Sequence, residues 1–218
     1  MTPLTPRLDV LPASQRRLWS EFRSSLPTSF VLYGGTALAL RTGGRQSEDF
    51  DFFSNNPIDA FELQAMFAFL AGSELVQAAP STATFLVDRG GRVKVSFFGG
   101  LTIGRVGEPS ICDDTGVRVA SLIDLAAQKV RVVQIRAEAK DYRDLLTLLH
   151  CGVTLPRAIG AARALYPDFA PLITLKALSY FGDGDLPTLP AAVQRTLSDA
   201  AANVHAIDPV ELVSATLA

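Results

Sequence analysis

The sequence predicts an α/β (α+β) protein with a small mixed sheet and flanking helices, followed by a helical lobe. Short apolar runs, some alternating with polar residues, fill the first half of the chain between glycine and proline turns. That pattern is typical of strands. Helical spacing takes over after Ser121, an N-cap residue that precedes an acid in the first turn. We therefore expect an α/β core over residues 1–120 and a helical lobe over residues 121–218.

The first expected element is a helix over residues 11–26. Leu18, Trp19 and Phe22 recur there at helical spacing, and Pro27 ends the pattern. We expect these apolar side chains in the core. The next expected elements, in chain order, are a strand over residues 29–33, a short helix over 36–41, a strand over 48–53, a helix over 59–70, and strands over 75–78, 82–87, 93–98 and 117–120.

The second half of the chain reads as helix throughout. Residues 121–150 carry a helical pattern with a break near Ala137. From Gly152 onward, prolines and glycines separate three or four further short helices. Apolar residues make up 48% of the 218-residue chain, so a sizeable core is available.

Composition narrows the classes of partner. The formal net charge is −2, whereas dedicated DNA-binding domains carry a strong positive excess, so no DNA partner is predicted. We find no signal peptide and no apolar run near the ~18 residues that span a bilayer, so we expect a soluble, cytoplasmic protein without a membrane partner. Cys112 and Cys151 lack zinc-site spacing and are expected as free thiols, Cys112 within a polar loop.

Gly34, Gly35 and Thr36 lie between a buried strand and a short helix. Glycines let a ligand approach the backbone closely, and the free N–H groups of a helix N-terminus favour an anion. Thr36 adds a hydroxyl donor at the same place. The segment matches neither a P-loop nor a dinucleotide fingerprint. These residues therefore predict a cradle for phosphate.

Asp49 and Asp51 stand two apart on the expected strand over residues 48–53, so both carboxylates point to one face. Neighbouring carboxylates repel each other unless a cation lies between them. Mg²⁺ prefers one or two carboxylates together with water and phosphate oxygens. The pair therefore predicts a Mg²⁺ site within reach of a triphosphate on the glycine cradle.

The combined pattern resembles a known family. The stretch FVLYGGTALALRTGGRQSEDFDFF resembles the first motif of the AbiEii/AbiGii abortive-infection toxins, which belong to the DNA polymerase β-like nucleotidyltransferase superfamily. Lys94 on an expected strand is similar to the second motif. Asp124 followed by Lys129 is similar to the third, and Asp141 after a lysine is similar to the fourth. These motifs occur in the family's order over residues 34–145.

The resemblance implies a role for each matched residue. Gly34, Gly35 and Thr36 would bind the triphosphate, and Asp49 with Asp51 would hold Mg²⁺. The remaining implied roles are charge neutralisation at phosphate by Lys94 and Lys129 and a late catalytic acid at Asp141. The implied protein is a Mg²⁺-dependent enzyme that moves a nucleoside monophosphate from a nucleoside triphosphate to a hydroxyl, with tRNA as the expected acceptor. It would be the toxin of a toxin–antitoxin pair with a possible cognate antitoxin, and its helical lobe would complete the active site and the acceptor cleft.

One departure keeps other readings open. Many relatives in the superfamily carry a third carboxylate where this sequence has Ser96. Either one metal suffices, or Asp141 contributes, or the site is catalytically weak. A non-catalytic nucleotide- or partner-binding module and a small-molecule, antibiotic-type nucleotidyltransferase are the alternatives.

Basic residues near the third and fourth motifs have two interpretations. On one continuous helix, Lys129, Arg136, Lys140 and Arg143 would form a single stripe. That stripe is either a solvated face, supported by a pair between Lys140 and Asp144, or a basic wall for phosphates. Of the two nearby acids, we assign Asp141 to the site and Asp144 to structure.

Overall fold

The computed structural model describes residues 2–23 and 25–218, and its chain divides into two compact units. The first unit comprises the described residues up to Gly104, together with Glu108–Ser121 and Ser214–Ala218. The second comprises Arg105–Gly107 and Leu122–Val213. The sequence predicts residues 214–218 in the helical lobe, whereas they belong to the first unit, where the backbone N–H of Leu217 donates to Asn55 Oδ1 at 2.8 Å.

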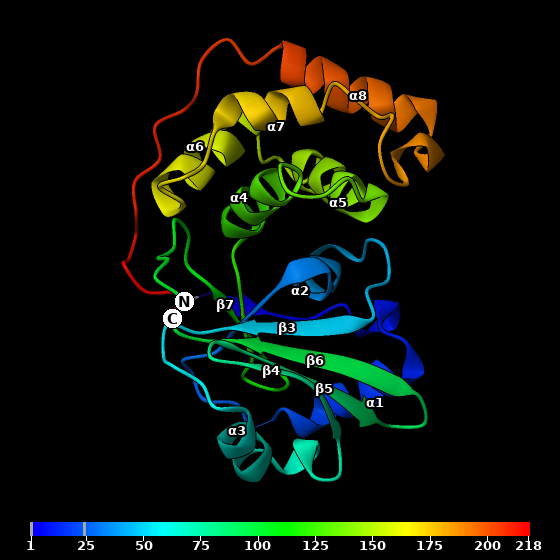
Figure 1. Ribbon diagram of the computed structural model, residues 1–218, viewed down its shortest axis with the longest axis vertical. Coiled ribbons are helices and arrows are strands. Elements are labelled where there is room, and N and C mark those ends of the chain that lie inside the picture. Colours follow the sequence, from blue (N-terminus) through cyan, green and yellow to red (C-terminus); the bar gives the residue numbers. More distant parts are fainter. Residues whose placement is uncertain (1, 24) are drawn as a thin grey trace. The chain divides into compact units, whose positions relative to one another are not determined.

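The described part of the first unit is built on a mixed, eight-stranded sheet, which confirms the predicted α/β class (Figure 1). Its spatial order is β1-β7-β8-β2-β3-β6-β5-β4. The central strand β3 runs antiparallel to β2 and parallel to β6. The strands are β1 (Pro3–Leu4), β2 (Val31–Tyr33), β3 (Asp49–Phe53), β4 (Glu74–Ala79), β5 (Thr82–Asp88), β6 (Arg92–Phe98), β7 (Ser110–Cys112) and β8 (Arg118–Val119).

One face of this sheet is apolar and is covered over the central strands. Phe50 and Phe52 of β3 are buried on it, because every second side chain of a strand points the same way. They pack against the aromatic rings of Trp19 and Phe22, which confirms the predicted core residues. The covering elements are α1 (Ala13–Glu21), α3 (Ala60–Met66) and a 3₁₀ turn, η2 (Ala68–Leu70).

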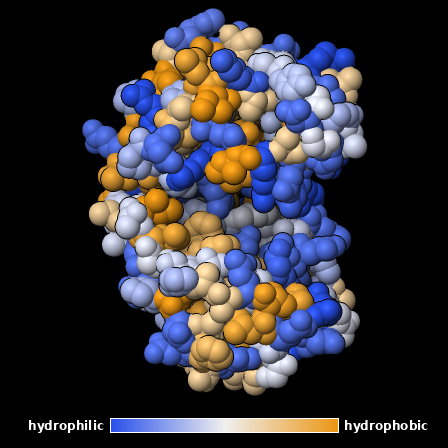
Figure 2. Space-filling view, viewed as in Figure 1, coloured by the Kyte–Doolittle hydropathy of each residue, from blue (hydrophilic) through white to orange (hydrophobic). Residues whose placement is uncertain are grey.

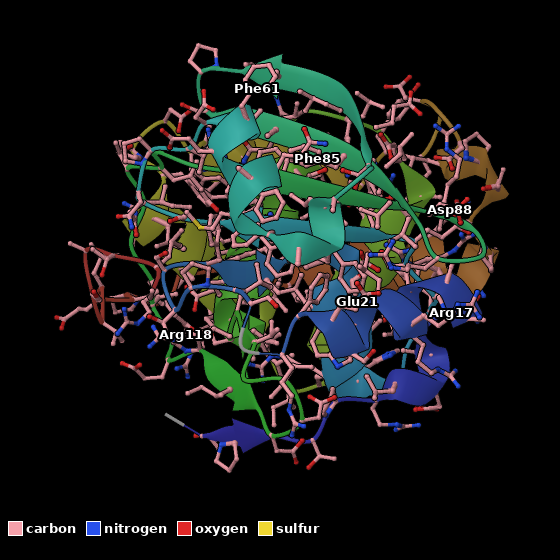
Figure 3. All side chains as sticks on the ribbon, turned by 90° about the horizontal axis from the view of Figure 1, so that it is seen from below. Arg17, Glu21, Phe61, Phe85, Asp88 and Arg118 are labelled. Carbon is pink, nitrogen blue, oxygen red and sulfur yellow. The ribbon has the colours of Figure 1, made fainter. Side chains whose placement is uncertain are left out.

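Figure 3 shows how α1 reaches the β5–β6 turn, where Arg17 and Glu21 lie toward Asp88. Arg89 Nη2 donates to Glu21 Oε2 at 2.7 Å, and the guanidinium of Arg17 donates to the carbonyls of Arg89 and Gly90. These contacts fasten the helix to the sheet and fix which of its faces covers the aromatic core.

The helix α2 (Gly34–Thr42) lies on the opposite side of the sheet (Figure 1). It begins at Gly34, two residues before the predicted helix over residues 36–41. Arg41 near its end donates to the carbonyls of Ala120 and Val119 at 2.7 and 2.9 Å. Gly43, with φ 69°, terminates the helix in the left-handed conformation that glycine adopts without strain.

Helices make up the second unit. They are α4 (Leu122–Val132), α5 (Ala139–His150), α6 (Leu155–Leu165), α7 (Pro171–Ala177) and α8 (Ala191–Ala202), with one 3₁₀ turn, η3 (Leu186–Thr188). The predicted break near Ala137 is confirmed by the end of α4 and the start of α5. No single helix among the described residues is long and apolar enough to cross a membrane.

Several predicted elements differ in extent. The helix over residues 11–26 is shorter, with α1 ending at Glu21, and Ser24 lies outside the described residues, as does Met1. The helix over residues 59–70 ends at Met66 and continues as the η2 turn. Strands β1 (two residues) and β7 (three residues) were not predicted; they pair with each other across more than 100 residues of sequence.

Cys112 was expected in a polar loop, but it is the last residue of β7 and is buried. Burial, together with the negative charge of Asp114, raises the pKa of its thiol to about 12. Thiolate formation at Cys112 is therefore suppressed, which argues against a reactive cysteine there. Cys112 and Cys151 are both free, as predicted.

The surface of the described residues is largely polar. On the face shown in Figure 2, hydrophilic residues separate the apolar ones into small patches. Exposed apolar side chains include Phe61 and Met66 of α3 and Leu172 of α7.

Candidate functional site

The acid pair lies on the polar face of the sheet. Asp49 and Asp51 alternate on β3 with the fully buried Phe50 and Phe52, so both carboxylates project away from the aromatic core. Each aspartate is half-buried. The antiparallel register pairs Asp51 with Tyr33, the residue immediately before α2. The sheet therefore brings the acid pair to the N-terminus of that helix.

Both glycines at this N-terminus are required by close neighbours. Gly34 has φ 73°, and a Cβ atom at this position would lie 2.6 Å from Asp51 Oδ2. A Cβ on Gly35 would lie 2.8 Å from Ser47 Oγ and 2.9 Å from the Nη2 atom of Arg45. Since real Cβ contacts are not that short, any larger residue would displace the carboxylate or the loop. The backbone at the start of α2 is therefore in close contact with the carboxylate of Asp51 and with the side chains of Ser47 and Arg45.

Thr36 lies in the first turn of α2, as expected, but its hydroxyl contacts the protein backbone. Its side chain is buried, and its Oγ1 donates to the carbonyl oxygen of Asp49. This hydrogen bond ties α2 to β3 and fixes where Asp49 begins the strand. Thr36 is therefore a positioning residue in this structure, because its hydroxyl proton is donated to the carbonyl oxygen of Asp49.

Lys94 lies beside the acid pair, on the neighbouring strand. The parallel register pairs Lys94 with Asp49, and its Nζ lies 2.7 Å from Asp49 Oδ2. The same register pairs Ser96 with Asp51. Ser96 is buried and accepts a hydrogen bond from Thr84 Oγ1 at 3.3 Å. In the ladder, Lys94 thus stands beside Asp49 and Ser96 stands beside Asp51.

The donor set of this face fits Mg²⁺ held jointly with a substrate. Among the described residues, no group of three or more His, Cys, Asp or Glu side chains is placed to enclose a metal ion. A closed structural zinc site would need such a group. Mg²⁺ instead takes one or two carboxylates and completes its shell with water and phosphate oxygens. Asp49 and Asp51, beside the N-terminus of α2, meet that requirement.

The second unit brings together the other predicted residues. Lys129 of α4 places its Nζ 2.8 Å from Asp141 Oδ1 and 2.7 Å from Asp144 Oδ2, both on α5. The side chains are 7%, 0% and 2% exposed, respectively. Arg136 Nε donates to the second oxygen of Asp141 at 2.8 Å. Both aspartates thus pair with the same buried lysine. We predicted a role in the site for Asp141 and a structural role for Asp144, but these contacts do not distinguish the two residues.

Charge sets the ionisation of Asp141. Burial by itself would raise the pKa of this carboxyl, but the hydrogen bond from Arg136 and the charge of Lys129 outweigh it. The pKa of Asp141 therefore lies below its ordinary value, and the carboxylate stays ionised at neutral pH.

The helix break removes the single stripe that one continuous helix would give. Lys129 lies on α4, Lys140 and Arg143 lie on α5, and Arg136 lies between the two helices. Lys140 Nζ pairs with Glu138 at 2.7 Å instead of with Asp144. The four cations therefore do not line one helix face, and Lys129 and Arg136 instead meet at Asp141.

Asp124, the acid of the third matched motif, is buried in the second unit. It accepts hydrogen bonds from the backbone N–H groups of Val106 and Gly107 at 2.8 and 3.1 Å. It therefore anchors the Arg105–Gly107 segment to the start of α4.

Sequence reasoning missed Arg45 and Ser47. Both lie in the loop between α2 and β3, with side-chain atoms against Gly35. The signal was present, because a basic and a hydroxyl residue stand between the glycine turn and the acid pair.

A match to one protein family covers most of the chain. The sequence profile of the AbiEii nucleotidyl transferase toxins, a type IV toxin–antitoxin system, matches residues 17–208. An uncharacterized protein of Aquifex aeolicus (strain VF5) is 32% identical over 157 residues, which cover 71% of this chain and 74% of that protein.

Solved structures share the fold. MenT4, a nucleotidyltransferase toxin of Mycobacterium tuberculosis H37Rv, superposes with a TM-score of 0.61 at 15% identity over 89% of this chain and 85% of that one. A protein of H. pylori, solved as a candidate nucleotidyltransferase, superposes with a TM-score of 0.57 at 19% identity over 87% and 92% of the respective chains.

Proposed function

The chain belongs to the AbiEii family of nucleotidyltransferase toxins from type IV toxin–antitoxin systems, and from that premise we propose that it transfers a nucleoside monophosphate from a nucleoside triphosphate to a hydroxyl group of RNA. Family membership implies a nucleotide substrate and a cognate antitoxin. We propose tRNA as the acceptor, in line with the resemblance found in the sequence. In the transfer, the acceptor oxygen bonds to the α-phosphorus, the bond to the β-phosphate breaks, and pyrophosphate and the hydroxyl proton leave.

The contact between Gly34 and Asp51 carries this proposal. It sets a carboxylate directly against the first of the two glycines at the N-terminus of α2, and helix N-termini attract phosphate. A site for anions thus adjoins carboxylates that can hold a cation. This arrangement suits a complex of a metal ion with a triphosphate better than the metal ion or the triphosphate alone. Gly34 and Gly35 would bind the phosphates through their backbone.

Asp49 and Asp51 would hold Mg²⁺, which when bound neutralises developing charge on the phosphates. The chain's own cations complete the charge balance. Lys94 stands at Asp49, and the guanidinium of Arg45 stands at Gly35. We propose that both contact the triphosphate, where fixed positive charge stabilises the leaving pyrophosphate.

Lys129 and Asp141 are proposed as positioning residues. Their burial and mutual ion pair favour a role in holding α4 to α5 over direct proton transfer or phosphate contact. A carboxylate held ionised by two cations is a poor acceptor of the hydroxyl proton of RNA.

The test is transfer of label to RNA. Purified protein is incubated with Mg²⁺, total bacterial tRNA and each α-labelled ribonucleoside triphosphate in turn. Asp51→Asn should lower the transfer rate at least about 100-fold, because it removes a metal ligand. The matched control is Glu48→Gln, which makes the same charge change at an exposed neighbouring residue and should transfer at nearly the wild-type rate.

Label on tRNA that the Asp51→Asn protein fails to add would support the proposal and name the nucleotide. Bound nucleotide with no label on any RNA would refute the RNA acceptor and favour a binding module or a small-molecule acceptor. Equal transfer by the Asp51→Asn protein would remove the acid pair from the mechanism.

A further inference from the structure

We propose that Lys94 couples nucleotide binding to metal binding, because its ammonium pairs with Asp49 in the absence of a triphosphate and shifts to the phosphates when one binds. This inference rests on the proposed function, and it assigns to one side chain a coupling between the affinities for the two ligands. The structure shows the pairing with Asp49, with Lys94 Nζ 2.7 Å from Asp49 Oδ2.

The register of the sheet places Lys94 and Asp49 side by side. Lys94 and Asp49 are direct neighbours in the parallel ladder between β6 and β3, and both point to the polar face. Asp51 faces Ser96 instead, and its carboxylate lies against Gly34. Lys94 therefore pairs with the first acid of the pair, and removal of its charge should change the metal affinity through Asp49.

The ion pair between Lys94 and Asp49 can open because both side chains are partly exposed to water. The side chains of Lys94 and Asp49 are 43% and 37% exposed, so water solvates both groups when they separate, and such pairs are weak. The buried Lys129 is the contrast, since two carboxylates fix it and only 7% of its side chain is exposed. A lysine ammonium on a flexible stem is a mobile point charge, which suits an exchange between neighbouring anions.

Electrostatics sets the direction of the exchange. An ammonium on Asp49 repels a divalent cation that approaches the same carboxylate, so metal binding is weakened while the pair persists. A triphosphate carries several negative charges and attracts Lys94 more strongly than one carboxylate does. Binding of the triphosphate would therefore draw Lys94 away from Asp49. The carboxylate of Asp49 would then be available to hold a metal ion together with the phosphates.

The experiment measures two affinities of the full chain separately. Mn²⁺ binding is followed by electron paramagnetic resonance without nucleotide, and triphosphate binding is followed by calorimetry in EDTA. Lys94→Gln should bind Mn²⁺ about three- to ten-fold more tightly and the triphosphate about three- to ten-fold more weakly, which is the scale of one half-exposed charge. General damage to the site would weaken both affinities. Tighter Mn²⁺ binding together with weaker triphosphate binding therefore distinguishes the coupling from damage.

Arg92→Gln is the matched control. Arg92 lies on the same strand and face as Lys94, is exposed, and pairs with Glu74, so its loss makes the same change in net charge away from the acid pair. Both affinities should stay within about two-fold of wild type. Thermal unfolding of both variants should remain close to that of wild type.

The outcomes separate the two proposals. Mn²⁺ affinity of Lys94→Gln that is unchanged or weaker would overturn the coupling, even where wild-type protein labels RNA. Wild-type protein that binds neither Mn²⁺ nor any triphosphate would overturn the proposed function together with the coupling. An Arg92→Gln protein that matches Lys94→Gln would reduce the effect to net charge and overturn it as well.

Discussion

Lys129→Met is the sharpest test of the buried charge cluster in the second unit. Methionine keeps most of the volume and length of the side chain and removes the ammonium. The carboxylates of Asp141 and Asp144 would remain, with side chains 0% and 2% exposed. Arg136 would still pair with one oxygen of Asp141, so that acid keeps part of its compensation while the repulsion between the two acids grows.

The expected cost follows from burial. Removing one partner of a buried ion pair costs about 3–5 kcal/mol, because a buried charge loses its counter-ion and gains no water in exchange. Two acids pair with Lys129, and Arg136 compensates one of them in part, so we expect the upper half of that range. A loss of that size is a large share of the about 5–15 kcal/mol by which most domains are stable.

The assay is urea unfolding at pH 7, followed by the helical circular dichroism signal that the second unit dominates. Lys140→Met is the matched control, because Lys140 also pairs with an acid at 2.7 Å but its side chain is 51% exposed. Its loss should cost no more than about 1 kcal/mol. Adding Asp144→Asn to Lys129→Met should restore part of the stability, since it removes one of the two acids that lost their lysine.

A loss below about 1 kcal/mol for Lys129→Met would refute this reasoning. It would mean that water reaches the cluster or that the acids take up protons at little cost. Normal stability combined with lost RNA labelling would return Lys129 to a direct role at the phosphates.

Further predictions concern single positions in both units. Gly34→Ala should cost about 1–2 kcal/mol by urea unfolding and abolish label transfer, because φ is 73° and the new Cβ would collide with Asp51. Trp19→Phe should cost about 1–3 kcal/mol in the same assay, since it removes the 2.7 Å hydrogen bond from Nε1 to Asp114. Asp141→Asn should destabilise at pH 7 and less so as the pH falls below about 3.9, the ordinary unfolded value. The folded-state pKa of Asp141 lies below that value, so its stabilisation exists above it and is lost as the pH falls through the folded pKa. A difference from wild type that grows in acid would contradict this sign.

The alternation of acids and phenylalanines over residues 48–53 was enough to predict β3 and its two faces. Period two is a local property of an extended chain, so Phe50 had to enter the core if Asp49 and Asp51 faced outward. The glycine turn and the helix after it were read for the same local reason. The order of the motifs along the chain then led to the family that the profile match bears out.

Contacts between distant segments were beyond the reach of such patterns. β1 exists because Pro3 pairs with Ile111, far along the chain, and the hydroxyl of Thr36 is engaged by the carbonyl of Asp49. The missed contact of Arg45 with Gly35 depends on how the loop after α2 folds back.

The sequence by itself determined the class of the fold, the face to which each acid of β3 points, and the position of the glycines at a helix N-terminus, because these depend on residues close together in the chain. Only the tertiary structure decided which charges meet. The sheet register sets Lys94 on Asp49, and the packing of α4 against α5 buries Lys129 between Asp141 and Asp144. Periodicity places a side chain on a face, but the partner across that face comes from another segment, whose register is settled by packing of the whole unit.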